Sequence, residues 1–398
     1  MFNSRLILKW FLLFAVALTI AVAGSAQQSS STPGVSADTI KLGAFIAQSG
    51  PVAGIGVPFM RGAEAWYSFV NAHGGINGRK IDFIVCDDGF VPANTVACVK
   101  KLLEEDKVFA IVNPLGTSPL AAVLDTLVKE GVPVVSPGAN ATFLSQPVKP
   151  NVFALQPSNV AFGRFAALYP VQALGAKRVA AVYSNDAFGN ELKDAFVAAL
   201  KEQGLEPVAL IGHAPNETNF SNIVLQLQQA KPDAVALLDL LQPSAAILKE
   251  AENLGFKTQF IGVNTVTDPR LFQLAGSSAA EGLIAPGFAA DPTSDIPGAV
   301  LYRAVLNDPN TGFPKEPAGG FSEIAMVGAQ LVTQGLASAG KNLTRQSFIA
   351  ALNQTSAWST GLTPPFSYTP KDHSGIKSLF VIQVKGGQFI SLGAFVPK

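Results

Sequence analysis

A strand, turn, helix, turn and strand follow one another in residues 40–90, and this pattern constrains the fold more than any other feature of the chain. Residues 40–47 are an apolar run of strand length, and three glycines in the next nine positions permit a tight turn. Pro58 suits the first position of a helix, whose apolar residues recur at helical spacing until Gly74 stops it. Residues 81–85 predict a second strand. The segment therefore predicts a βαβ unit.

This unit also locates a candidate binding site. In a βαβ unit the loop after the first strand lies beside the N-terminus of the helix, where free N–H groups suit an anionic or polar ligand. Two later predicted strands, residues 108–112 and 132–135, also end in loops of small residues. Because the carboxyl ends of parallel strands share one edge of a sheet, we expect the three loops to converge.

A second set of alternating strands and helices begins near residue 178. Its predicted strands are residues 178–183, 207–211, 234–239 and 259–262. The right-handed crossover rule makes them a parallel sheet of their own. The predicted fold class is therefore α/β, with two doubly wound, Rossmann-like lobes.

Residues 1–26 have the features of a secretory signal peptide. Arg5 and Lys9 precede an apolar stretch that ends in small residues, and cleavage after Ala26 or Ala23 fits the small-residue rule. The alternative, an uncleaved membrane anchor, is disfavoured because the apolar stretch is shorter than the about 20 residues that span a bilayer. We expect an exported protein that is not inserted in the membrane after cleavage.

The chain has two cysteines, Cys86 and Cys98, at the end of a predicted strand and in the next helix. In an oxidising compartment a disulfide is expected, and a pair of buried thiols is the alternative. The three histidines are scattered and, with two cysteines, offer no spacing typical of a metal site.

Charge and motifs exclude several function classes. Without Arg5 and Lys9 the chain has 26 basic and 28 acidic residues, a net charge of −2, and no basic patch that would bind nucleic acid. We find no Gly-x-Ser-x-Gly elbow, no His-Glu-x-x-His and no phosphate loop followed by lysine. Phe59 stands where a dinucleotide fingerprint needs a small residue. We therefore expect neither an enzyme nor a cofactor.

Six short landmarks follow one another along the chain. They are Ser49-Gly50-Pro51, Gly74-Gly75-Ile76-Asn77-Gly78-Arg79, Asp87-Asp88, Ser136-Pro137-Gly138-Ala139, Gly175-Ala176-Lys177-Arg178-Val179 and Ala280-Glu281-Gly282. Each landmark alone is weak, but together they cover nearly all of the mature chain in order. This set resembles the type I periplasmic binding proteins that serve branched-chain amino acid ABC transporters.

The resemblance implies two lobes joined by three crossovers, with a ligand cleft between them. Lobe 1 would comprise residues 37–155 and 288–364, and lobe 2 residues 156–287 and 365–398. The third crossover would lie near residues 365–368. The family captures small solutes in the periplasm and delivers them to a membrane permease that a separate ATPase drives. We accordingly expect a periplasmic monomer that performs no chemistry on its ligand.

The resemblance also assigns the end of the site that holds a ligand carboxylate. In amino-acid-binding members, hydroxyls and backbone N–H groups of two loops hold this group. The corresponding residues are Leu115, Gly116, Thr117, Gly138, Ala139 and Asn140. Thr117 offers a hydroxyl and Asn140 an amide beside helix N-termini, which favour negative charge. The alternative is that Thr117 and Asn140 only cap helices.

The opposite end of the site departs from the family. Members that bind amino acids place an acidic side chain where this chain has Asn264. A buried ammonium without an ionic partner costs several kcal/mol, so Asn264 disfavours a zwitterionic ligand unless another acid substitutes. Asp239, at the end of a predicted strand, is the candidate substitute, and a solvated or capping role is its alternative.

Apolar residues replace aromatic or hydroxyl-bearing residues common in the family. Phe188, Leu241 and Ile55 stand at such positions, although Phe188 could instead be core. The leading expectation is therefore a small carboxylate with an apolar or aromatic body. A branched-chain or other amino acid or amide is the alternative ligand, and a soluble ligand sensor is the alternative function.

Overall fold

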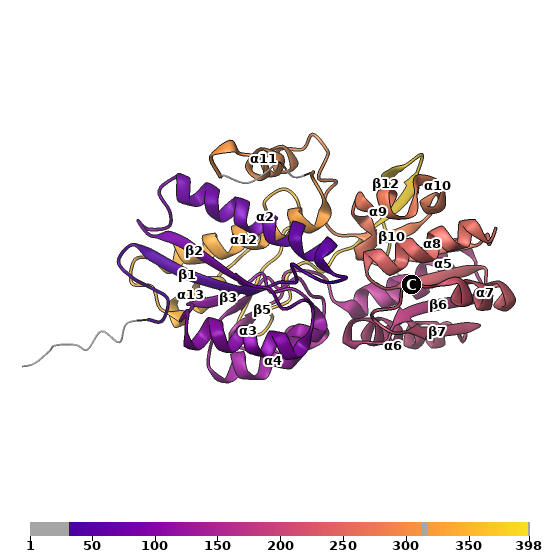
Figure 1. Cartoon of the computed structure of the whole chain (residues 1–398), viewed down its shortest axis with the longest axis horizontal. Coiled ribbons are helices and arrows are strands. Elements are labelled where there is room, and N and C mark those ends of the chain that lie inside the picture. Colours follow the sequence, from indigo (N-terminus) through magenta and orange to yellow (C-terminus); the bar gives the residue numbers. More distant parts are fainter. Residues whose placement is uncertain (1–31, 312–314, 316, 397–398) are drawn as a thin grey trace, which may run out of the picture. The chain divides into compact units, whose positions relative to one another are not determined.

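The computed structural model describes residues 32–311, 315 and 317–396, and every structural statement below concerns these residues. The predicted signal peptide, residues 1–26, lies outside them. The strands form two sheets. The first has the order β2-β1-β3-β4-β5, and all its pairs are parallel (Figure 1). Its strands are β1 (Thr39–Phe45), β2 (Lys80–Cys86), β3 (Ala110–Val112), β4 (Val134–Val135) and β5 (Val152–Phe153).

Strand β1 lies between β2 and β3 and is buried on both faces. Leu42 pairs with Phe83 of β2 and with Ala110 of β3. Leu42 belongs to one apolar cluster and Phe45 to another, and both side chains are fully buried. Side chains of a strand alternate between faces, so an apolar run without alternation is what a doubly covered strand requires.

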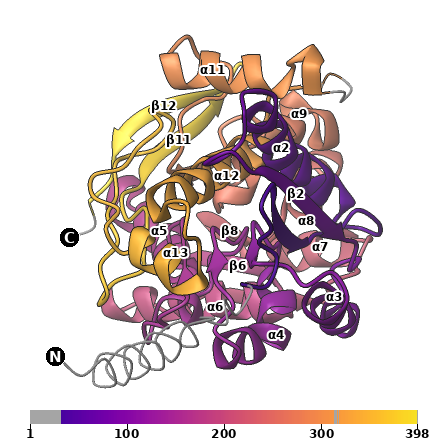
Figure 2. The ribbon, with the colours of Figure 1, turned by 90° about the vertical axis from the view of Figure 1, so that its left-hand side faces the viewer.

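Helices on both faces of this sheet supply the cover. From β1 to β2 the chain advances towards one edge of the sheet, and from β2 through β3 to β4 it advances towards the other edge. Because each crossover is right-handed, α2 lies on one face of the sheet and α3 and α4 lie on the other. Figure 2 shows α12 beside α2, and the two helices are in contact. The helices of this region are α2 (Ala53–Ala72), α3 (Pro92–Glu104), α4 (Thr117–Lys129), α12 (Gly320–Ala339) and α13 (Arg345–Leu352).

Helix α2 begins at Ala53, five residues before the predicted start at Pro58, so Pro58 lies inside the helix. Proline has no N–H group and cannot bond the carbonyl four residues earlier, which is that of Gly54. A donor from elsewhere satisfies this carbonyl: the Nη1 group of Arg270 donates a hydrogen bond to it. The sequence offered no sign of this compensation, because Arg270 is distant in the chain.

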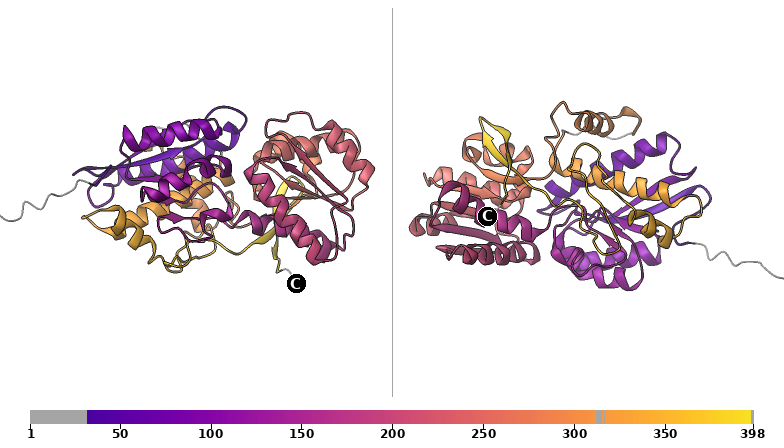
Figure 3. Two further views of the ribbon diagram at one scale, coloured as in Figure 1. Left: turned by 90° about the horizontal axis from the view of Figure 1, so that it is seen from below. Right: turned by 180° about the vertical axis from the view of Figure 1, so that it is seen from behind.

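The second sheet has the order β12-β11-β10-β9-β8-β6-β7. Pairs from β10 to β7 are parallel, whereas β11 runs antiparallel to both β10 and β12. The yellow hairpin in Figure 3 is this C-terminal pair. The strands are β6 (Val179–Ser184), β7 (Ala209–His213), β8 (Ala234–Leu238), β9 (Gln259–Gly262), β10 (Ile284–Gly287), β11 (Phe380–Lys385) and β12 (Gln388–Ala394).

Helix pairs cover the second sheet as well, with α5 packed on α6 and α7 packed on α8. These helices are α5 (Asn159–Leu174), α6 (Ala187–Glu202), α7 (Ser221–Ala230) and α8 (Leu241–Asn253). The remaining helices are α9 (Arg270–Ala275), α10 (Ser277–Ala280), α11 (Pro297–Leu306), η1 (Thr142–Leu144), η2 (Asn264–Thr267) and η3 (Pro309–Thr311). The two-sheet α/β fold class is confirmed.

The third connection between the sheets lies later in the chain than the predicted residues 365–368. The hydroxyl of Tyr368 donates to the carbonyl of Ala154 at 2.8 Å, and the N–H of Ile376 donates to Leu155 at 2.8 Å. Residues 368–376 therefore lie against the end of the first sheet, and the chain enters the second at Phe380. Tyr368 is buried against Phe153, with ring centroids 5.3 Å apart, and this contact between distant residues holds the segment on the first sheet.

The predicted disulfide is confirmed. Cys86 at the end of β2 is bonded to Cys98 in α3, and the two Cα atoms are 5.7 Å apart. A bond that closes so short a loop stabilises the fold by about 3 kcal/mol on the chain-entropy estimate. It fixes α3 to the edge of the sheet. Among the described helices, none is both long and apolar enough to span a bilayer.

Candidate functional site

Three loops meet at the carboxyl ends of β1, β3 and β4. The N–H of Leu115 donates to the carbonyl of Phe45 at 3.0 Å. The N–H of Gly116 donates to Gly138 at 3.1 Å, and the N–H of Gly138 donates to Pro114 at 2.8 Å. The strand order reverses between β1 and β3, which is where doubly wound sheets bind ligands. The predicted convergence of the loops is therefore present.

Two glycines allow aromatic rings to pack directly on these loops. Gly116 has a φ of 105°, and a Cβ atom there would lie 2.4 Å from the Phe90 ring. A Cβ atom at Gly138 would lie 2.7 Å from Phe59 and 2.8 Å from Leu115. These contacts are too close for any side chain. The glycines thus bring phenylalanine rings up to the loop backbone.

The loops form part of the wall of a cavity of about 160 Å³. Loops and helices around the first sheet line it together with strands and loops of the second sheet. Among the predicted site residues, those in its wall are Ile55, Leu115, Gly116, Thr117, Gly138, Ala139, Asn140, Phe188 and Asn264. Asp239 and Leu241 are not in the wall, and Leu240 lies there instead.

Thr117 and Asn140 do not act as helix caps. Gly116 is the N-cap of α4, and no side chain caps this helix. Thr117 is the first helical residue and lies in the cavity wall with 3% of its surface exposed. The amide of Asn140 donates to the carbonyl of Pro157 at 2.8 Å, so Asn140 secures the first connection between the sheets. The capping alternative therefore does not describe either residue.

Asp239 is fully buried and paired within the second sheet. Its Oδ2 atom is hydrogen-bonded to Nε2 of His213, and its Oδ1 accepts from the N–H of Leu240 at 2.8 Å. Burial lowers the pKa of His213, but the hydrogen bond and charge of Asp239 outweigh burial and raise it above its usual value. The carboxylate thus has partners within the protein and does not reach the cavity. It is not placed to bind a ligand ammonium.

Sequence reasoning missed most of the aromatic wall. The cavity is lined by Phe59, Phe90, Phe188, Phe288, Phe321, Phe380 and Phe389, of which only Phe188 was predicted. A composition of 27 phenylalanines against 5 tyrosines was a signal, but it gave no positions. In the hairpin, Phe380 and Ile382 of β11 and Phe389 and Ser391 of β12 line the cavity. Residues two apart on a strand share one face, so this spacing could have identified them.

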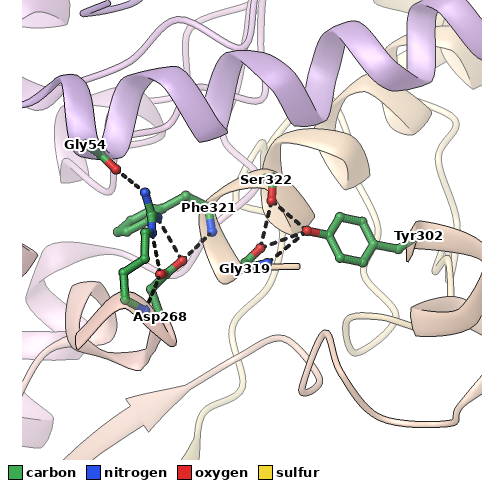
Figure 4. A network of polar contacts seen from close by, with 7 residues as sticks. Gly54, Asp268, Tyr302, Gly319, Phe321 and Ser322 are labelled. Carbon is green, nitrogen blue, oxygen red and sulfur yellow. Dashed lines mark hydrogen bonds and ion pairs between the residues drawn. The ribbon is translucent and has the colours of Figure 1, made fainter. Parts of the chain in front are cut away.

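A polar network joins α9 to α2 and α12 beside the cavity (Figure 4). Arg270 forms two bonds with Asp268, at 2.7 Å to Oδ1 and 2.9 Å to Oδ2, and also bonds the carbonyl of Gly54. Its guanidinium lies 5.0 Å from the centroid of the Phe321 ring. Oδ2 of Asp268 accepts from the N–H of Phe321 at 3.4 Å. The second sheet is thus tied to both long helices of the first.

Tyr302 fixes the start of α12 in the same region. Its hydroxyl is 2.6 Å from the Ser322 hydroxyl, donates to the carbonyl of Gly319 at 3.1 Å and accepts from the N–H of Gly319 (Figure 4). The first turn of α12, which contains Glu323, is therefore held in place.

Two acceptors in the cavity wall have no donor among the described residues. Oε1 of Glu323 and Oδ1 of Asn264 are both buried without a hydrogen bond. Glu323 has 1% of its surface exposed. Burial raises the pKa of Glu323 well above its usual value, and the negative charges of Asp291 and Asp268 raise it further. Neither Glu323 nor Asp291 was predicted from the sequence.

Comparison with known proteins adds the family context. A family model described as "Periplasmic binding protein" matches residues 39–388. The Leu/Ile/Val/Thr-binding protein of Salmonella typhimurium is 31% identical over 248 residues, which are 62% of this chain and 67% of that protein. The Leu/Ile/Val-binding protein of Escherichia coli is 30% identical over the same shares of the two chains.

Solved structures share the fold. A branched chain amino acid ABC transporter protein from Thermus thermophilus with bound valine has a TM-score of 0.83 at 21% identity, covering 92% of this chain and 98% of that one. The fatty acid ABC transporter substrate-binding protein from Thermomonospora curvata has a TM-score of 0.82 at 23% identity, covering 92% and 94%.

Proposed function

Since the chain belongs to the family of periplasmic binding proteins, we propose that it captures a small carboxylate with an apolar or aromatic body in this cavity and delivers it to the permease of an ABC importer. The proposal includes export by the signal peptide of residues 1–26, a periplasmic location and a monomeric protein. It involves no chemistry on the ligand.

The observation that carries the proposal is a phenylalanine-lined cavity whose wall includes the N-terminus of α4. Phenylalanine rings stabilise an apolar body by removing it from water. A volume of about 160 Å³ is close to that of an apolar cavity which holds a benzene ring. Thr117 and the free N–H groups of the first turn of α4 suit a carboxylate.

Two lobes that close on the ligand are part of the proposal. With the contacts of residues 368–376 taken into account, we assign residues 37–155 and 288–376 to lobe 1 and residues 156–287 and 377–398 to lobe 2. A ligand that contacts both lobes favours the closed form through its additional contacts. Thr117 would bind it first, and Phe188 and Asn264 would complete the enclosure. The permease would recognise the closed surface.

An amino acid or amide is the second candidate ligand. The curated relatives are described as binding leucine, isoleucine and valine. Asp239 cannot supply the missing acid, because it is buried against His213. Glu323, whose Oε1 atom has no hydrogen-bond donor among the described residues and which lies in the cavity wall, supports this candidate instead.

The test is a thermal-unfolding screen of the purified mature protein, followed by calorimetric titration. We expect benzoate- or cinnamate-type acids to bind and leucine to bind weakly. A ligand present at 100 times its dissociation constant stabilises the folded state by about 2.7 kcal/mol. Cinnamamide, which lacks the negative charge, is the matched control and should bind more weakly than cinnamate. Tight binding of leucine with no response to the aromatic acids would reverse the ranking.

A further inference from the structure

We propose that Glu323 is a specificity-determining residue of the cavity that binds a cationic amine group of the ligand, and that binding releases a proton from the protein. The inference rests on the proposed function and favours its second candidate, a ligand that carries an amine group as well as a carboxylate. Its starting point is the pair of acceptors, Oε1 of Glu323 and Oδ1 of Asn264, for which the described residues provide no donor.

A buried acceptor without a donor costs about 1–3 kcal/mol, and native proteins rarely leave one unexplained. Two buried acceptors without donors in the wall of one cavity are explained if the ligand supplies the donors. An ammonium group has three N–H donors and no acceptor. The acceptors come from different sheets, since Asn264 follows β9 and Glu323 is in the first turn of α12.

Other contacts bring these two segments together. Oδ2 of Asp268, four residues after Asn264, accepts from the N–H of Phe321, two residues before Glu323. A ligand donor that bonds both acceptors would therefore connect segments that already touch. This connection would add to the contacts that favour lobe closure.

The charges around Glu323 favour a cation over an anion. Asp268 and Asp291 both act on it electrostatically and are both in the cavity wall. Arg270 forms an ion pair with Asp268, which leaves the charge of Asp291 and the carboxyl of Glu323 without a cation in the described contacts. Tyr302 is a further titratable group that interacts electrostatically with Glu323, and burial raises the pKa of Tyr302. A ligand carboxylate would be repelled here and belongs at the α4 end.

The proton balance follows from the burial of Glu323. Burial raises its pKa well above the usual value, so the free protein keeps the carboxyl protonated to a higher pH than an exposed glutamate does. An ammonium ligand favours the charged form, so the carboxyl loses its proton to solvent and forms the ion pair. Affinity for such a ligand must therefore increase with pH, by up to about tenfold for each pH unit over which the free protein holds the proton.

The experiment uses three probes with one apolar body: L-phenylalanine has both charged groups, 2-phenylethylamine only the amine and 3-phenylpropionate only the carboxylate. Each is titrated calorimetrically at pH 6 and pH 8, in buffers of different ionisation enthalpy. We expect the amine-bearing probes to release protons on binding and to bind more tightly at pH 8 than at pH 6. Binding of 3-phenylpropionate should show no proton release at Glu323.

Glu323→Gln keeps the size of the side chain and removes its titration. We expect this variant to lose the proton release and to bind the amine-bearing probes at least tenfold more weakly at pH 8, with 3-phenylpropionate unchanged. Glu206→Gln is the matched control, because the Glu206 side chain is 69% exposed. Circular dichroism checks that the variant folds, and the buffer dependence of the wild type tests the proposal without it.

The outcomes separate this inference from the proposed function. If only 3-phenylpropionate binds, or if amine-bearing probes bind without proton release, the role of Glu323 is refuted and the carboxylate-binding function remains. If only 2-phenylethylamine binds and Glu323→Gln abolishes it, the role of Glu323 is supported and the carboxylate function is refuted. Binding of none of the three probes would refute both.

Discussion

At the scale of single residues, hydrogen-bond partners decide which of two equally buried carboxyl groups is available to a ligand. Asp239 and Glu323 are both almost completely buried. Asp239 has a histidine and a backbone N–H as partners, whereas Oε1 of Glu323 has none among the described residues. A sequence shows that an acid follows a strand, but the partner of Asp239 is 26 residues away.

His213→Ala should destabilise the protein without changing the cavity. The variant leaves Asp239 buried without its partner, and breaking a buried pair costs about 3–5 kcal/mol. Because the folded protein raises the pKa of His213, the stabilisation by protonated His213 is complete below about pH 6.5 and is lost as the pH rises through the raised value. Urea unfolding at pH 6 and pH 9 measures both effects.

The cost of His213→Ala should therefore be larger at pH 6 than at pH 9. His73→Ala serves as the control, since His73 is exposed and bonds only the backbone of its own helix. Equal unfolding free energies for the two variants would show that the buried pair contributes nothing.

At the scale of elements, the irregular start of α2 is connected to the other sheet. Pro58 removes the hydrogen bond that Gly54 would accept within the helix. Arg270 of α9 supplies the donor, and the same guanidinium neutralises Asp268. A local defect in one helix is thus the attachment point for another.

A double-mutant cycle on Arg270→Gln and Pro58→Ala tests this connection. Arg270→Gln should lower the free energy of unfolding by about 3 kcal/mol, the lower end of the range for a buried pair, because Asp268 is 2% exposed and loses its cation while Arg270 is 21% exposed. Alanine at position 58 has the backbone N–H group that proline lacks, and this group can donate to the carbonyl of Gly54. The double variant should therefore recover about 1 kcal/mol relative to the sum of the single changes, the net value of a hydrogen bond. Strict additivity in urea unfolding would contradict the connection.

At the scale of the whole molecule, the cavity exists only because both sheets contribute to it. Thr117 comes from the loops of the first sheet, and Phe188 and Asn264 follow strands of the second. In a two-lobe mechanism, ligand encounter involves the open form, while release requires the contacts between lobes to break.

Phe188→Ala should consequently accelerate ligand release more than it slows association. We expect the dissociation rate to increase about tenfold, corresponding to more than 1 kcal/mol of lost contact, with the association rate changed less than threefold. Stopped-flow tryptophan fluorescence measures both rates. Phe256→Ala is the control, since Phe256 also belongs to the second sheet region but does not line the cavity. An effect confined to the association rate would contradict closure after binding.

The sequence by itself determined the fold class, the converging loops and the disulfide partners. These features follow from short-range patterns: apolar runs, glycines at turns, and two cysteines in adjacent elements. The family landmarks are likewise local, which is why they could be recognised in order along the chain.

Only the tertiary structure decided what surrounds the cavity. It paired Asp239 with His213, brought Glu323 and Asp291 to the wall, and added phenylalanines from α2, α12 and the C-terminal hairpin. The start of α2 and the third connection between the sheets also differ from the predicted positions, and contacts of Arg270 and Tyr368 accompany these differences. The physical reason is that burial and hydrogen-bond partners depend on residues far apart in the chain, and no local pattern records which distant group arrives.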